Sequence, residues 1–192
     1  MALLLLLLGL LGLLRLWPGL EPSPTTAQEL NLRSIVQNNY NMARVSGIWY
    51  SISVASSNLT RFREHGDLRV FVRRLEHLDN GSLKFDLRFR VQGQCVPVIM
   101  IGQRTGKDGE YLISYQGDNR VLVLETDYSL FIILYLNNTQ GQTKTQALAL
   151  YGRTPHLSSP FLKRFEEACK RFGLDPGTIL LLRGQDNCYH ER

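Results

Sequence analysis

Apolar and polar residues alternate through the middle of the chain, and this pattern predicts a series of short β-strands. A period of two places one face of a strand in a core and the other face in water. The clearest case is the stretch 84–91, where four apolar residues alternate with four charged ones (Phe85, Leu87, Phe89 and Val91 against Lys84, Asp86, Arg88 and Arg90). The turn signal Asn80-Gly81 precedes it. Strands are expected at about 48–55, 68–73, 84–91, 95–101, 111–115, 121–126, 131–136 and 143–151, with a loop over 137–142.

A helical period follows the strands. Five apolar residues recur at the spacing of one helix face, and charged residues fill the other face (Phe161, Phe165, Ala168, Cys169 and Phe172). Ser159 as the N-cap, Pro160 at the first helical position and Gly173 just beyond the end predict the bounds of this helix. A helical turn is expected at 35–42 and a last short strand near 178–182.

These elements predict an all-β fold. Eight antiparallel strands in sequence order, followed by one helix, are typical of a closed up-and-down barrel whose interior holds one small ligand. The stretches 121–126 and 131–136 are apolar on both faces, so the helix is expected to pack outside the barrel against them. The sequence shows no repeat and no second domain.

The N-terminus indicates secretion. The apolar run from Leu3 to Leu14 is shorter than the ~20 residues that a transmembrane helix needs, and it fits the core of a secretory signal. Small residues at Thr25 and Ala27 predict a leader over 1–27 and a mature domain over 28–192, although an earlier cleavage site stays open. Three N-x-S/T acceptors, at Asn58, Asn80 and Asn137, all fall in predicted loops. We therefore expect a secreted, extracellular glycoprotein without membrane insertion.

Composition excludes several classes of function. The hydrophobic fraction of 44% in 192 residues supports one packed core, and the net charge of +5 is mild. The arginines are scattered along strands rather than gathered with aromatic residues, so nucleic-acid binding is not expected. Three cysteines (Cys95, Cys169 and Cys188) imply one pair and one remaining thiol. They lack close Cys/His spacing, so neither a metal nor another cofactor is expected.

Three motifs carry a family resemblance. The segment 41–50, Asn-Met-Ala-Arg-Val-Ser-Gly-Ile-Trp-Tyr, resembles the Gly-x-Trp signature of the lipocalins. Thr126-Asp127-Tyr128 and Tyr151-Gly152-Arg153 resemble the family's second and third motifs, in the right order. The segments 68–71, 109–111, 150–153 and 165–173 are similar to the urinary and odorant-binding branch, and within it to the epididymal secretory lipocalins. The resemblance covers the whole mature chain.

The resemblance implies structural roles for these residues. Trp49 would close the base of the barrel with the Arg153 guanidinium stacked on its indole, and Gly47 would allow a tight start to the first strand. Thr126, Asp127 and Tyr128 would form the second structural motif. A disulfide would join Cys95 to Cys188, which leaves Cys169 as a buried, inert thiol.

The resemblance also assigns the interior positions. Those expected to face a ligand are Leu68, Val70, Val72, Leu75, Phe85, Leu87, Met100, Ile113, Tyr115, Val121, Leu134, Leu136, Ala147, Ala149 and Tyr151. The set holds no charge, its two alanines leave space, and its two tyrosine hydroxyls offer polar contacts. The expected ligand is a small neutral or weakly polar molecule, such as an odorant-like alcohol, ketone or ester, or a slim lipid. The alternative is that these residues only fill a closed core.

The same sequence also bears on two functions other than that of a carrier. One lipocalin branch isomerises prostaglandins with a thiol inside its barrel, but here no cysteine falls on an inward position, and no catalytic Ser/His/Asp set or carboxylate pair converges. An enzyme is therefore not expected. A secreted glycoprotein that acts through its surface on a cell or receptor, with the cavity unused, stays open as the alternative.

Overall fold

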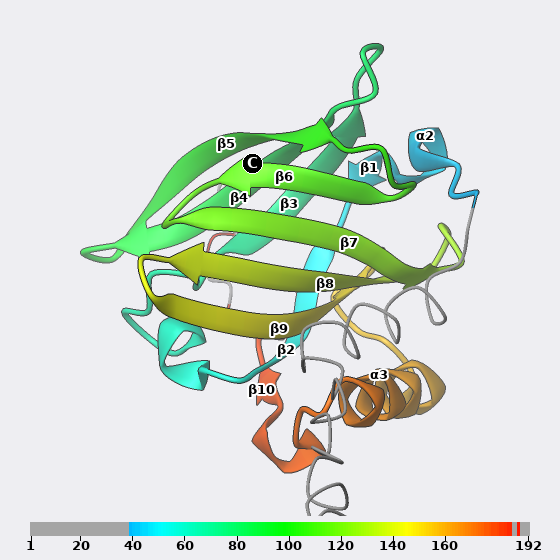
Figure 1. Ribbon diagram of the computed structural model, residues 1–192. Coiled ribbons are helices and arrows are strands. Elements are labelled where there is room, and N and C mark those ends of the chain that lie inside the picture. The colour runs from blue at the N-terminus through cyan, green and yellow to red at the C-terminus, as the bar shows by residue number, and fades with distance from the viewer. Residues whose placement is uncertain (1–38, 186–187, 189–192) are drawn as a thin grey trace, which may run out of the picture. The chain divides into compact units, whose positions relative to one another are not determined.

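The computed structural model describes residues 39–185 and Cys188 (Figure 1). The chain divides into two units, Met1–Ile35 and Val36–Arg192, and the fold described here belongs to the second. The predicted leader, its cleavage site and the first part of the helical turn expected at 35–42 lie outside the described residues. Within the described part of the chain, no helix is long and apolar enough to cross a membrane.

The strands form one antiparallel sheet in which neighbours in sequence are mostly neighbours in space. They are β1 (Gly47–Ile48), β2 (Tyr50–Ser56), β3 (Phe71–His77), β4 (Leu83–Val91), β5 (Gln94–Arg104), β6 (Glu110–Ser114), β7 (Asp118–Thr126), β8 (Phe131–Gln140), β9 (Thr143–Gly152) and β10 (Leu180–Leu181). Their order in the sheet is β1-β3-β4-β5-β6-β7-β8-β9-β2-β10. The predicted meander is therefore confirmed, and Figure 1 shows β6 to β9 in front of β3 and β4.

The first predicted strand closes the barrel because it divides at Trp49. β1 pairs with β3, whereas β2 pairs with β9 at the other end of the meander. One continuous segment thus joins both edges of the sheet. The expected eight-stranded barrel is confirmed. The count of ten along the described chain arises from this division and from β10, whose Leu180 pairs with Val54.

A β-bulge in β3 decides which residues face the interior. The strand begins at Phe71, so Leu68 and Val70 lie in the segment before it. The pairing with β4 passes from Val72 directly to Arg74, which leaves Arg73 as the extra residue. An extra residue shifts the alternation by one position. Leu75, and not Arg74, is therefore buried after the bulge.

The expected loop over 137–142 is wrong for its first four residues. β8 continues to Gln140, and a tight turn at Gly141 (φ 59°) leads into β9. Four polar residues, 137–140, resemble a loop in sequence, yet each pairs with β9 across the extended hairpin. The side chain of Asn138 is wholly buried, and its amide donates to the carbonyl oxygen of Gln116 and to Oδ1 of Asn119. The predicted glycosylation acceptor Asn137 is one of these paired residues, so it lies in a strand and not in a loop.

The C-terminal helix covers the outside of the barrel, as expected. α3 (Ser159–Arg171) has Ser158 as its N-cap, one residue earlier than predicted, and Gly173 follows it with a φ of 69°. The Phe161 and Phe172 rings lie 5.1 and 5.3 Å from outward-facing rings of β8, those of Phe131 and Tyr135 respectively. Three short helical segments complete the fold: α2 (Met42–Val45), η1 (Leu59–Phe62) and η2 (Pro176–Thr178).

The base of the barrel is closed around Trp49, which is wholly buried. Its indole nitrogen donates to the carbonyl oxygen of Val45 at 2.8 Å. Gly47 begins β1 with a φ of +127°, and a Cβ at this position would lie only 2.6 Å from Nη1 of Arg153. Asp127 accepts three backbone N–H groups of the β7–β8 turn, and Thr126 donates to the carbonyl oxygen of Phe131. The open space of the barrel therefore lies toward the other end.

Candidate functional site

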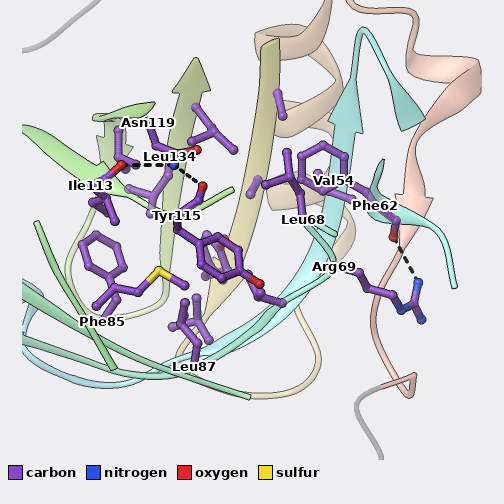
Figure 2. A pocket seen from close by; sticks show the side chains of 18 of the residues that line it. Val54, Phe62, Leu68, Arg69, Phe85, Leu87, Ile113, Tyr115, Asn119 and Leu134 are labelled. Atoms are coloured by element: carbon purple, nitrogen blue, oxygen red, sulfur yellow. Dashed lines mark hydrogen bonds between the residues drawn. The ribbon is translucent and has the colours of Figure 1, made fainter. Parts of the chain in front are cut away.

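The barrel contains a partly open cavity of about 110 Å³ (Figure 2). Strands on all sides contribute to its wall, and most of the lining is apolar. The lining residues are Val54, Phe62, Leu68, Arg69, Val70, Val72, Phe85, Leu87, Met100, Ile113, Tyr115, Asn119, Val121, Leu134, Leu136, Ala147, Ala149, Tyr151 and Leu182. This is the concave apolar geometry that small-molecule sites share.

The structure brings together all the predicted interior residues except Leu75. Leu75 is wholly buried in the core near the base, in one cluster with Val45 and Trp49. The bulge in β3 turns it inward, but toward packed side chains. Its expected place in the cavity wall is therefore wrong, whereas the other fourteen positions line the open space.

The alanines of β9 form one side of the cavity. Ala149 stands between Val54 of β2 and Leu134 of β8 in the register of the sheet, and all three line the cavity. Ala147 is opposite Leu136 in the same way. Cross-strand neighbours lie only about 5 Å apart, so a larger side chain at Ala149 would occupy the space next to both neighbours.

Sequence reasoning missed five lining residues: Val54, Phe62, Arg69, Asn119 and Leu182. Only Val54 carried a usable signal, because it lies on an alternating predicted strand. Leu182 lies against the barrel because its backbone N–H donates to the carbonyl oxygen of Ile52 at 2.9 Å. Phe62 comes from the loop between β2 and β3, whose path no local pattern predicts. Arg69 belongs to the same loop because the strand expected from residue 68 begins only at Phe71.

That loop, residues 57–70, contributes Phe62, Leu68, Arg69 and Val70 to the cavity wall, and we call it the lid. Phe62 and Leu68 of the lid are buried in a cluster with Val54, Phe71, Ala147 and Leu182. The lid therefore contributes apolar wall to the cavity.

A buried arginine pins the lid to the barrel. Arg61 is 9% exposed, and its Nε and Nη2 donate to the Asp67 carboxylate at 2.9 and 2.5 Å. Its Nη1 donates to Thr145 Oγ1 at 3.2 Å and to the Asn138 amide oxygen. The hydrogen bond from Arg61 holds the pKa of Asp67 below its usual value, although burial acts in the opposite direction. The guanidinium thus joins the lid to β8 and β9.

Asn119 lines the cavity without offering it a polar contact. Its amide nitrogen donates to the carbonyl oxygens of Ile113 and Tyr115 (Figure 2). The same nitrogen also donates to the carbonyl oxygen of Gly117, and the amide oxygen accepts from Asn138. The protein itself therefore uses both ends of this amide.

Two tyrosine hydroxyls have no such partners. Neither Tyr115 nor Tyr151 donates its phenolic proton to any residue in the described ranges, and both rings line the cavity. Burial raises the pKa of both phenols, and the charge of Asp67 adds to the effect at Tyr115. Both are neutral donors at physiological pH, and a ligand inside the cavity could accept from them.

The expectation of an interior without charge needs one correction. Arg69 lies directly after Leu68 at the end of the lid, and its side chain forms part of the wall. Arg61 of the lid is absent from the lining because it is held within its own polar network.

Among the described residues, no histidine, cysteine, aspartate or glutamate lines the cavity. Among residues 39–185 and Cys188, no three His, Cys, Asp or Glu side chains come together to hold a metal ion. Cys169 is wholly buried on the barrel side of α3, and burial raises the pKa of its thiol to about 12. Cys95 of β5 and Cys188 form a disulfide with a Cα–Cα distance of 5.6 Å, which links the C-terminal segment to the barrel wall.

A family model described as the lipocalin and cytosolic fatty-acid binding protein family matches residues 46–183. The chain belongs to the lipocalin family. It is 48% identical over 171 residues to epididymal-specific lipocalin-9 of Mus musculus, covering 89% of this chain and 96% of the relative. It is 47% identical over 189 residues to the Homo sapiens protein of the same name, covering 98% and 92%. The resemblance to epididymal lipocalins is confirmed.

A solved structure supports the same fold. The possum milk whey lipocalin trichosurin, solved with bound 4-ethylphenol, superposes with a TM-score of 0.69 at 27% identity. The match covers 73% of this chain and 98% of trichosurin.

Proposed function

We propose that this lipocalin is a secreted carrier that binds a small hydrophobic molecule inside its barrel. The observation that carries the proposal is the apolar cavity inside the barrel, whose two tyrosine hydroxyls have no hydrogen-bond partner among residues 39–185 and Cys188. Buried polar groups are normally hydrogen bonded, so these hydroxyls favour a ligand with an oxygen acceptor. Odorant-like alcohols, ketones and esters, and slim lipids, have this chemistry.

The related structure supports the proposed class of ligand. The 4-ethylphenol bound to trichosurin is a small apolar ring with one hydroxyl. A ligand of this kind in the present cavity would bury its carbon atoms against the strand side chains and place its oxygen near Tyr115 or Tyr151. At about 0.8 kcal/mol for each buried methylene, less the cost of association, a micromolar dissociation constant is the expected limit.

Secretion is part of the proposal. The leader over 1–27 and the mature domain over 28–192 are inferred from sequence, and the Cys95–Cys188 disulfide fits an oxidising compartment. Asn80 is exposed in the β3–β4 turn and Asn58 is half-buried at the start of the lid. Both positions suit a glycan better than Asn137, which is half-buried within β8.

The alternative is a glycoprotein that acts through its surface on a cell or receptor. It draws support from three apolar side chains exposed on the outer side of β5 and β6, those of Ile99, Ile101 and Leu112. The cavity would then be unused.

Filling the cavity separates the two functions. A neutral fluorescent probe, N-phenyl-1-naphthylamine, should bind the mature protein and be displaced by medium-chain alcohols and ketones. Ala149→Phe should abolish that binding while the β-rich circular dichroism spectrum persists. Overpacking costs about 1–3 kcal/mol, which the disulfide-linked barrel should tolerate. Ala43→Phe, at an exposed position of α2, is the matched control and should bind as wild type does.

If the probe binds Ala149→Phe as tightly as wild type, the cavity is not the site and the surface-acting glycoprotein becomes the better interpretation. Mass spectrometry of the natively purified protein would then identify any small molecule that stays bound.

A further inference from the structure

The strand pairing of the barrel is interrupted between β5 and β6. Pairing joins these two strands only at Gln103 with Leu112 and at Arg104 with Tyr111. On their other sides the same strands are fully paired, β5 with β4 throughout residues 94–102 and β6 with β7 along its whole length. The break is therefore local to one boundary of the sheet.

The register shows which residues lie on either side of the break. Continued from the pair of Gln103 and Leu112, it would set Ile101 opposite Ser114, yet the described strands do not pair there. We call this stretch the seam, residues 100–102 of β5 and residues 113–115 at the end of β6. No strand pairing has to be broken for the two sides of the seam to move apart.

The inner side of the seam is cavity wall. Met100 on the β5 side and Ile113 and Tyr115 on the β6 side all line the cavity. A molecule that passed between the two strands here would therefore enter the apolar interior directly.

The outer side of the seam is apolar as well. Ile99 and Ile101 flank the inward-facing Met100 in β5, so they face outward, and their exposed fractions are 53% and 39%. Leu112 precedes the inward-facing Ile113 in β6 and is 48% exposed. Exposed apolar side chains that lie together mark sites of contact. A hydrophobic ligand can therefore leave water at the seam before it reaches the cavity.

The lid, by contrast, is fastened to the barrel. The buried Arg61 donates to Asp67 within the lid, to Asn138 and Gln140 of β8 and to Thr145 of β9. Lifting the lid would separate this guanidinium from its partners, and removing the partner of a buried charge is strongly unfavourable.

From an unpaired seam with cavity residues on its inner side and exposed apolar side chains on its outer side, we propose that the hydrophobic ligand enters and leaves the barrel through the seam while the lid stays closed. The inference rests on the proposed function, because it requires the cavity to hold ligand. It assigns the first contact with that ligand to Ile99, Ile101 and Leu112.

A metal clamp across the seam tests this route. In the double variant Ile101→His/Ser114→His, two imidazoles face outward from opposite positions of neighbouring strands, where they can bind one zinc ion. Stopped-flow fluorescence of N-phenyl-1-naphthylamine gives the rate constants of binding and release. In this variant zinc should slow both by at least about tenfold, because a closed gate limits entry and exit alike. The dissociation constant should stay unchanged, and a chelator should restore both rates. Wild type with the same zinc concentration is the matched control and should not change.

A second variant tests the lid without the clamp. Asp67→Asn removes the charge that holds Arg61 and should loosen the lid. If the seam is the route, this variant should bind and release the probe no faster than wild type. Asp79→Asn, in the exposed β3–β4 turn, is its control.

The outcomes are distinguishable. If zinc binds the double variant in a titration but leaves both rate constants unchanged, or if Asp67→Asn accelerates both, the ligand passes under the lid. This inference is then wrong while the proposed function stands. If the probe does not bind wild type, the proposed function fails and this inference fails with it.

Discussion

The guanidinium carbon of Arg153 lies 3.8 Å from the centre of the Trp49 ring. The same guanidinium donates hydrogen bonds to four backbone carbonyl oxygens (Arg44, Ser46, Ile48 and Tyr128, at 3.0 to 3.1 Å). Burial lowers the pKa of Arg153, and the nearby charge of Asp127 acts against that effect. Arg153 therefore links three parts of the fold: the segment before the first strand, the point where that strand divides, and the β7–β8 turn.

Arg153→Lys should therefore destabilise the barrel although it keeps the charge. An ammonium group lacks the planar fork that stacks on an indole and reaches several carbonyl oxygens at once. We expect a loss of about 2 kcal/mol, within the range for hydrogen bonds to charged groups. For a chain of this size that loss lowers the midpoint of thermal unfolding by about 4–8 °C. Arg63→Lys, at an exposed position, should unfold as wild type does, and equal midpoints for the two variants would show that the fork is dispensable.

Gly47→Ala should also destabilise the fold. The backbone of Gly47 has a φ of +127°, and an added Cβ would lie 2.6 Å from Nη1 of Arg153. Such backbone strain costs about 1–3 kcal/mol, and the displaced guanidinium adds to the loss. Gly106→Ala is the control, because a Cβ at Gly106 has no atom within 4 Å and its φ is not positive. Chemical denaturation should find the first variant less stable and the second close to wild type, and the reverse order would contradict the geometry.

The sequence predicted those parts of the fold and cavity that depend on local alternation. Phe85 and Leu87 of β4 and Ala147 and Ala149 of β9 lie on regular strands, so a period of two was sufficient to place them in the cavity wall. The sequence predicts that Leu75 faces inward, and it does so after the bulge. The sequence does not predict how deep into the barrel the cavity extends. Depth depends on how Trp49 and Val45 pack from another part of the chain.

The polar network around Arg61 had no signal in the sequence. Asn138 lies in the stretch predicted as a loop and Thr145 lies in a predicted strand, yet both side chains are wholly buried and accept from Arg61. Buried polar residues of this kind are stable only because their partners come from distant elements. Arg69 was missed for the same reason, because its position in the cavity wall depends on the path of the lid.

Cys169 should be unreactive in the folded protein. Its side chain is wholly buried in α3, and burial raises the pKa of the thiol to about 12, so that the reactive thiolate is scarce at pH 8. Iodoacetamide should modify Cys169 only when denaturant is present, and peptide mapping without reduction should recover Cys95 joined to Cys188. Rapid alkylation of the native protein would show that α3 leaves the barrel surface readily.

The lid should loosen in acid because of Asp67. The hydrogen bond from Arg61 lowers the pKa of this carboxyl group in the folded state. A group with a lowered pKa stabilises the fold above its unfolded pKa, near 3.9, and that stabilisation is lost as the pH falls through the lowered value. Wild type should therefore be more stable than Asp67→Asn at pH 7, and the difference in thermal midpoint should shrink below about pH 4 and vanish in stronger acid. Asp79→Asn, in the exposed β3–β4 turn, controls for the loss of a negative charge and should follow wild type throughout. A difference between wild type and Asp67→Asn that stayed constant from pH 7 to strong acid would mean that the Asp67 carboxylate does not hold the lid through its charge.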